Sequence, residues 1–293
     1  MSTDTEDVYI PAASDSTTSS EDRKSCSTCS QMADSDPVFL YSIGRIQPRF
    51  PNMGIEKEFA QSVGRRNMEA LSDGQVMHEI LSDPKNRYLA RKLRWVFSVK
   101  ELDIYLLQPM NPLDLDMLIE TLRPVPRLTD VNVVIGVLGP VAPSNYCNGL
   151  RLPLVVFDQL YSFDVDSLIK AIPKPDKTSA KNFEPIAEEL FMKVIQMTDN
   201  RGATDEHRVL NYLAVRYPAI YSISADCHSR NSSLVRVDIK TSALTLGGGR
   251  KIMDAIFSFA NRMTDFTEKY YCRVDVSEEF PFLFSKMQPF LDR

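Results

Sequence analysis

The sequence predicts an α+β protein with a mixed α/β N-terminal half and a C-terminal half of helices packed on a three-stranded antiparallel sheet. In the second half, segments with helical periodicity precede a run of alternating, β-branched segments. This order favours helices layered on an antiparallel sheet over a doubly wound parallel sheet. A polar stretch with two prolines, residues 173–182, separates the halves.

Composition changes sharply near residue 37. Residues 1–36 are rich in Ser, Thr and Asp, carry eight acidic and two basic side chains, and hold few large apolar residues. Such a segment buries too little surface to offset the entropy of ordering. We therefore expect a disordered acidic tail at 1–36, a mixed α/β domain at 37–172, a linker at 173–182, and helices plus antiparallel sheet at 183–293.

Spacing of apolar residues and turn signals predict the elements of the first half. In chain order these are an extended segment Val38–Ile46, helices Ile55–Ser62, Gln75–Leu81 behind the cap Asp73, and Arg87–Lys92, a hairpin of Trp95–Val99 with Leu102–Leu107, a helix Pro112–Leu122, buried strands Val131–Leu138 and Leu154–Tyr161, and a short helix from the cap Asp164 to Ile172.

In the second half, helices are expected at Phe183–Thr198 and Thr204–Tyr217, followed by three strands. The first strand should place Val235, Val237 and Ile239 inward, the second should cover Ile252–Asn261, and the third should place Tyr270, Cys272, Val274 and Val276 on one face. An exposed strand edge of this sheet would let an extended peptide add as a further strand.

The sequence predicts both ends of the helix at 204–217. Thr204 is a good N-cap, acidic residues follow in the first turn, and Pro218 should end the helix near Tyr217. Leu210, Leu213, Ala214 and Tyr217 form one apolar face. The helix should therefore pack against the sheet.

The same helix holds the best candidates for acid–base chemistry. Histidine side chains generally titrate near neutrality, which suits His207 to acid–base work. Glu206 beside it and Asp164, from the carboxylates at 158–166, complete a candidate catalytic set. Adjacent helical residues point in different directions, however. The alternative is structural, with the acidic residues favouring the helix dipole, His207 near the cap, and Asp164 capping its own helix.

No cofactor is expected from the motifs, although a zinc site formed by Cys147, His207 and Cys272 is a second possibility. The wide spacing means that these ligands could meet only through tertiary folding, and ordinary thiols are the alternative. Cys26 and Cys29 form a C-x-x-C in the tail. The glycines at 247–249 precede a strand, which favours a hairpin loop over a phosphate-binding loop.

Composition also narrows the class of protein. No apolar run is long enough to span a membrane, and no secretory signal precedes the body, so a cytoplasmic location and no membrane contact are expected. Outside the tail the chain has 31 of its 39 acidic residues and 32 of its 34 basic residues, so the net charge of the body is near zero. This near-neutral body predicts no nucleic-acid partner.

Several long strings of the body carry a resemblance to a known family. They are Ser42–Gly64, Asn86–Leu93, Cys147–Leu150, Val155–Pro175, Gly202–Tyr221 and Glu278–Leu283. Together these strings resemble the C-terminal domain of cyanobactin maturation proteins of the PatG and PatA type, from the patellamide pathway. The subtilisin-like protease that usually accompanies this domain has no counterpart motif here, so its chemistry does not transfer.

The resemblance implies an accessory interaction domain that binds a precursor peptide or partner maturation enzymes, with a homodimer as a further expected form. The alternative from another class is a peptide-modifying enzyme with its site around His207. Neither the reaction nor the substrate follows from the residues.

Overall fold

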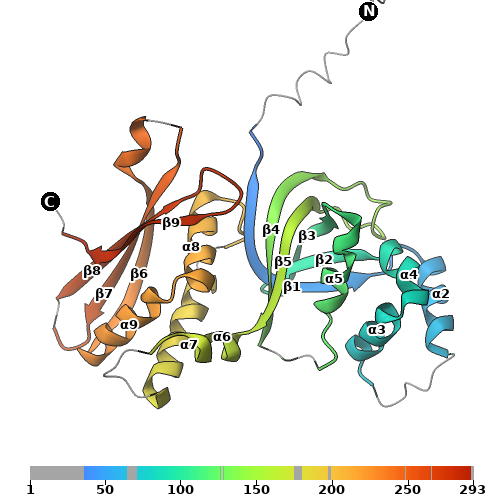
Figure 1. Cartoon of the computed structure of the whole chain (residues 1–293), viewed down its shortest axis with the longest axis horizontal. Coiled ribbons are helices and arrows are strands. Elements are labelled where there is room, and N and C mark those ends of the chain that lie inside the picture. Colours follow the sequence, from blue (N-terminus) through green and yellow to red (C-terminus); the bar gives the residue numbers. More distant parts are fainter. Residues whose placement is uncertain are drawn as a thin grey trace, which may run out of the picture. The chain divides into compact units, whose positions relative to one another are not determined.

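Five strands of the N-terminal half close into a barrel. In the computed structural model they are β1 (Phe39–Arg49), β2 (Arg94–Val99), β3 (Leu102–Pro109), β4 (Asp130–Val141) and β5 (Pro153–Asp164). Their order is β1-β2-β3-β5-β4, and β1 closes the barrel because its first half pairs with β4 and its second half with β2. The β3–β5 pair is parallel and the others are antiparallel. This order, with a helix between the third and fourth strands, is the arrangement of the OB-fold (Figure 1).

The structure describes residues 36–64, 71–125, 127, 129–174, 180–196, 199–247, 249–264 and 266–291, without the side chains of 180–182 and 246–247. Residues 37–293 form one compact unit. Residues 1–35 of the expected disordered tail, with its C-x-x-C, and residues 175–179 of the expected linker lie outside the described residues.

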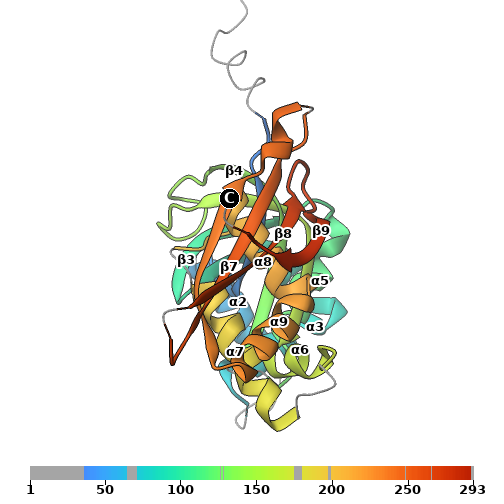
Figure 2. The same ribbon diagram turned by 90° about the vertical axis from the view of Figure 1, so that its left-hand side faces the viewer.

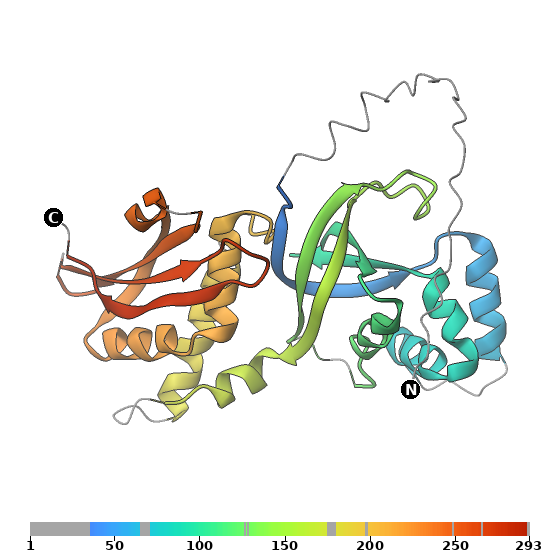
Figure 3. The ribbon, with the colours of Figure 1, turned by 45° about the horizontal axis from the view of Figure 1, so that its top comes forward.

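Short helices surround the barrel. Those between β1 and β2 are α2 (Met53–Gly64), α3 (Asp73–Ser82), the 3-10 turn η1 (Pro84–Asn86) and α4 (Arg87–Lys92), and the pair between β3 and β4 is η2 (Pro112–Asp114) with α5 (Leu115–Glu120). Helices α2 to α4 lie beside the barrel on the side away from α8 (Figure 3). The N-cap of α3 is Ser72, one residue before the expected Asp73, because the Ser72 N–H donates to the Gln75 side chain at 3.0 Å.

The second half is a layer of helices against an antiparallel sheet. Its elements are α6 (Val165–Ala171), α7 (Ala180–Gln196), α8 (Asp205–Arg216), α9 (Ala219–Ser229), β6 (Ser232–Thr241), the 3-10 turn η3 (Ala243–Gly247), β7 (Ile252–Asn261), β8 (Thr267–Asp275) and β9 (Phe282–Pro289). The strand order is β6-β7-β8-β9. Figures 1 and 2 show the helices on one face of this sheet. The α+β class and the expected layer are confirmed.

The sheet has four strands, so the expected three-stranded sheet is wrong. The missed strand, β9, alternates in exposure, but its aromatic residues point outward: Phe282 is 48% and Phe284 40% exposed. The sequence analysis therefore assigns no strand to this segment. The expected inward position of Val235 is also wrong, because a bulge between Leu234 and Arg236 turns this side chain outward.

Helix α9 was not expected from the sequence. It begins directly after Pro218, the residue that ends the preceding helix. Proline breaks the interior of a helix but is favoured at its start. The first N–H groups of a helix have no intrahelical acceptor, so the N–H that proline lacks is not missed there.

The apolar core crosses the expected boundary between the halves. Tyr41, Ile43, Val133 and Ile135 on the outside of the barrel belong to the same buried cluster as the apolar faces of α7, α8 and the sheet. A second cluster fills the barrel interior. The division into domains at 173–182 stays a prediction. No helix in the described part of the chain combines the length and apolar character needed to cross a bilayer.

Candidate functional site

The segment from Gly202 to Asn211 fastens α8 to the barrel. The Tyr41 N–H donates to the Gly202 carbonyl at 3.0 Å, and the Asn211 amide donates to the Tyr41 carbonyl at 2.8 Å. Asn211 also exchanges hydrogen bonds with Asn200, and all these groups are buried. Gly202 has φ +79°, and a Cβ there would lie 2.4 Å from the Tyr41 carbonyl oxygen, so the contact requires glycine.

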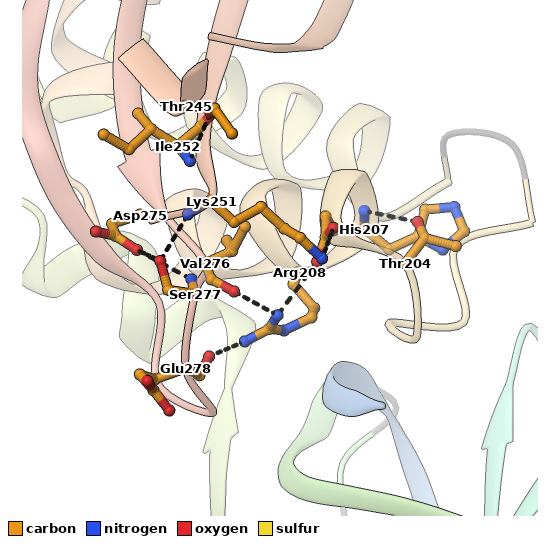
Figure 4. A network of polar contacts seen from close by, with 11 residues as sticks. Thr204, His207, Arg208, Thr245, Lys251, Ile252, Asp275, Val276, Ser277 and Glu278 are labelled. Carbon is orange, nitrogen blue, oxygen red and sulfur yellow. Dashed lines mark hydrogen bonds and ion pairs between the residues drawn. The ribbon is translucent and has the colours of Figure 1, made fainter. Parts of the chain in front are cut away.

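Arg208, one turn into α8, organises the loop between β8 and β9 (Figure 4). Its side chain is 3% exposed and donates to the carbonyls of Val276 at 2.9 Å, Glu279 at 3.2 Å and Glu278. Burial lowers the pKa of Arg208, and the charge of Asp205 opposes this shift. A buried charge held by backbone carbonyls and one carboxylate is a structural device.

The carboxylate of Asp205 is shared between two cations. It accepts from Arg208 Nη1 at 3.3 Å and pairs with Lys251 Nζ at 2.9 Å. The Lys251 backbone N–H donates to Ser277 Oγ at 2.7 Å, which ties the β6–β7 connection to the same loop (Figure 4). The polar cluster predicted around His207 is therefore largely a junction between α8, the sheet and the barrel. We call Gly202, Arg208, Asn211 and Asp205 the α8 junction.

The two predicted catalytic residues of α8 lie at its margin. Glu206 is exposed and His207 half-buried. The His207 N–H donates to Thr204 Oγ1 at 3.3 Å, which confirms Thr204 as the N-cap. The imidazole points away from Arg208 and Lys251 (Figure 4).

Asp164 lies apart from His207. Helix α6, which Asp164 caps, lines a small cavity together with Ala214 and Val215 of α8. These residues lie about 11–12 Å along the helix axis from His207 at 1.5 Å per residue. The structure does not bring the three predicted catalytic residues together, and their catalytic role stays a prediction.

The carboxylate of Asp164 is fully engaged. It accepts from Arg127 at 3.0 Å, Thr129 at 2.5 Å and both the N–H and the hydroxyl of Ser167 at 3.3 and 2.9 Å. The hydrogen bond from Thr129, with those from Ser167 and Arg127, lowers the pKa of Asp164 to about 2 against the opposing effect of burial. The predicted cap is confirmed, and a carboxylate held ionised in this way is a weak proton acceptor.

The two cysteines among the predicted metal ligands occupy separate apolar environments, and His207 lies apart from both clusters at the start of α8. Cys147, between β4 and β5, packs against Val96 and Leu106, whereas Cys272 lies in the core under the sheet. Burial raises the pKa of both thiols, that of Cys272 to about 12. Among the described residues no three His, Cys, Asp or Glu side chains gather as metal ligands. The zinc site stays a prediction.

An open groove runs beside the C-terminal half of β5, with a volume of about 840 Å³. We call it the β5 groove. Its residues come from α5, the following connection, β5 and α6: Met117, Glu120, Arg123, Pro124, Val125, Arg127, Leu160, Tyr161, Ser162, Phe163, Asp164 and Ser167. Arg127 pairs with Asp164, and Arg123 pairs with Asp130 at 3.3 Å. Arg123, Arg127 and Asp164 are thus paired within the chain, and Glu120 adds a fourth charged side chain to the lining. Apolar side chains supply much of the remaining lining.

Tyr161 links this groove to α8. Its hydroxyl lies 2.6 Å from the hydroxyl of Tyr41, and the guanidinium carbon of Arg216 lies 4.8 Å from the Tyr161 ring centroid. Burial raises the pKa of Tyr41, so its phenol stays neutral. The sequence signalled this region only through aromatics among the carboxylates at 158–166, and it gave Arg216 no role.

The sheet has two edge strands, β6 and β9, and the edge at β9 is partly occupied by the chain itself. On β9, the N–H of Leu283 donates to the hydroxyl of Tyr212 on α8 at 3.1 Å, and the N–H of Met287 donates to the hydroxyl of Tyr217, the C-cap of α8, at 2.8 Å. A peptide adding to β9 would have to displace both tyrosines. This edge is therefore occupied at these two positions by the chain itself.

Comparisons with known proteins place the chain in a family. Residues 39–246 match the profile of the family described as PatG Domain. A solved structure titled "PatG Domain of Unknown Function" shares the fold, with a TM-score of 0.69, 17% identity, and coverage of 86% of this chain and 98% of that one. No curated protein matches. The profile covers more than half of the sequence, and the chain therefore belongs to the PatG domain family.

Proposed function

We propose that this chain is an accessory interaction domain of cyanobactin-type peptide maturation and that it binds an extended, apolar peptide segment in the β5 groove. Membership of the PatG domain family fits this biosynthetic context. The single observation that supports the binding site is the groove itself. Its volume of about 840 Å³ is within the range of small-ligand sites and would hold a few residues of a peptide.

The chemistry of the groove favours an apolar occupant. Met117, Val125, Leu160 and Phe163 supply apolar surface, and Val125 is 70% exposed. Arg127 and Arg123 are paired with carboxylates of the chain, so a charged ligand would have to break these pairs. Binding should therefore depend on apolar contact and change little with salt concentration.

Other surfaces are less suited to the role. The outer face of β2 and β3, which OB-folds use for oligonucleotides, is covered by the β4–β5 connection, where Ala142 and Cys147 bury Val96 and Leu106. The β9 edge already donates to tyrosine hydroxyls. The β5 groove carries no such cover among the described residues.

Titration of labelled precursor-peptide segments by fluorescence anisotropy tests the proposal. Val125→Asp should weaken binding at least tenfold, because it places a charge on the apolar wall. Val141→Asp is the matched control, since Val141 is also an exposed valine, at 54%, and lies outside the groove lining. Equal affinity of both variants, or no micromolar binding of any segment, would contradict the proposal.

The alternative of a peptide-modifying enzyme has its own test. Purified chain incubated with the same segments would change their mass, and His207→Ala would abolish the change with the fold intact. The engaged Asp164 and the high pKa of the buried thiols give no support to this alternative. A product that depends on His207 would favour it over the interaction domain.

A further inference from the structure

We propose that Arg216, with Tyr161 and Tyr41 behind it, binds the C-terminal carboxylate of a peptide lying in the β5 groove. The inference rests on the proposed function and specifies which end of a peptide the groove takes. It is carried by the geometry of three side chains where α8 meets the barrel wall.

Arg216 lies at the margin of the groove. It is an exposed residue in the last turn of α8, and its guanidinium lies 4.8 Å from the ring of Tyr161, which lines the groove. In the part of the chain that the structure describes, no carboxylate pairs with Arg216. This distinguishes it from Arg123 and Arg127 in the same groove, which have acidic partners.

The two phenols hold this guanidinium and add a donor. Tyr41 is 2% exposed, and its hydroxyl lies 2.6 Å from that of Tyr161. Each phenol has one O–H to donate, and their mutual hydrogen bond uses only one of the two. Arg216 also hydrogen-bonds to both phenols, which uses part of its five N–H groups. The remaining N–H groups are the donors that the cluster offers to a ligand with acceptors.

A carboxylate fits this cluster better than a larger anion. The planar fork of a guanidinium matches a carboxylate in a bidentate arrangement. Burial keeps the Tyr41 phenol neutral, so Arg216 supplies the positive charge of the cluster, which one carboxylate balances. An internal peptide segment would present only neutral carbonyls to Arg216. A C-terminal end would present a carboxylate, which would pair with this guanidinium, for which the described residues supply no carboxylate.

Two probes that differ in one group test the inference. They are an N-acetylated pentapeptide of alanine, valine and phenylalanine with a free C-terminal carboxylate, and the same peptide as its C-terminal amide. Their affinities for the full chain are measured by NMR titration. The free acid should bind about fivefold more tightly, the value of one partly exposed ion pair.

Variants assign the difference to Arg216. Arg216→Gln should bring the acid and amide affinities within twofold of each other, and Arg216→Lys should recover part of the difference, because it restores the charge without the fork. Arg250→Gln, an exposed arginine in the β6–β7 connection, should leave the difference unchanged. Circular dichroism checks that each variant is folded.

The remaining outcomes separate this inference from the proposed function. Equal binding of acid and amide, both weakened by Val125→Asp, would overturn the carboxylate site and leave the groove in place. Inorganic phosphate displacing the acid as effectively as acetate does would overturn the assignment to a carboxylate. No binding of either peptide would overturn both proposals.

Discussion

The α8 junction and the β5 groove hold similar residues and use them differently. At the junction, Arg208 is almost fully buried and donates to the carbonyls of Val276, Glu278 and Glu279. At the groove margin, Arg216 is exposed and stacks near the ring of Tyr161. A dense polar segment in a sequence can therefore mark a structural junction, where an arginine is used up by contacts within the chain. An arginine on an open surface keeps donors for a ligand.

The largest effect on stability should come from Arg208→Leu. The change removes the donor for three loop carbonyls and leaves the Asp205 carboxylate without its buried partner. Loss of one partner from a buried charged network typically costs about 3–5 kcal/mol. Urea unfolding measures it, with Arg216→Leu as the control that should cost under about 1 kcal/mol. Equal costs for the two arginines would contradict the structural role assigned to Arg208.

A slightly smaller loss is expected for Leu213→Ala. Leu213 is fully buried in the core between α8 and the sheet, so truncation removes burial and leaves a cavity. The expected cost is about 2–5 kcal/mol. Thr204→Ala, which removes only the cap, should cost about 0.5–2 kcal/mol. If urea midpoints at an unchanged slope ranked the cap above the core residue, the packing of α8 would be misassigned.

The acid dependence of stability should reveal Asp164. Its folded pKa of about 2 is lower than the usual value of about 3.9, so the folded state favours the ionised form. The stabilisation is therefore present above about pH 4 and lost as the pH falls towards 2. Asp164→Ala should cost about 1–3 kcal/mol at pH 7, and the difference from the wild type should shrink at pH 2.5. A difference independent of pH would show that the carboxylate charge is not what holds this cap.

Val125→Asp should have the smallest effect on stability among these variants and a clear effect on peptide binding. Val125→Asp changes an exposed side chain and should alter the free energy of unfolding by no more than about 0.5 kcal/mol. The same change should weaken peptide binding. Urea unfolding and peptide anisotropy are measured on the same variant. If Val125→Asp lowered both the free energy of unfolding and the affinity, Val125 would support the fold instead of binding the peptide directly.

Local signals in the sequence predicted local structure well. The hairpin around Lys100 and Glu101 was expected, and both residues have positive φ, of 50° and 64°, as a tight hairpin turn requires. The caps Thr204 and Asp164 were also expected, because each N-cap contact lies within three residues. Such features depend on neighbours in the chain.

Features that depend on distant residues were missed. The barrel closes through pairing of Ser42 with Val134, and no local pattern announces a partner 92 positions away. The role of Arg208 depends on a loop some 70 residues further on. The β5 groove joins α5 to β5 in the same way, so its residues carried no shared signal in the sequence.

Chemical-shift mapping on the isotope-labelled chain shows which residues a bound apolar peptide touches. We predict the largest shifts at residues 117–125 and 160–167, which line the groove, with a further shift at Arg216. The α8 junction should change little, because its donors are already bound within the chain. Shifts centred instead on Thr204, His207 and Lys251, with the groove unchanged, would contradict the account.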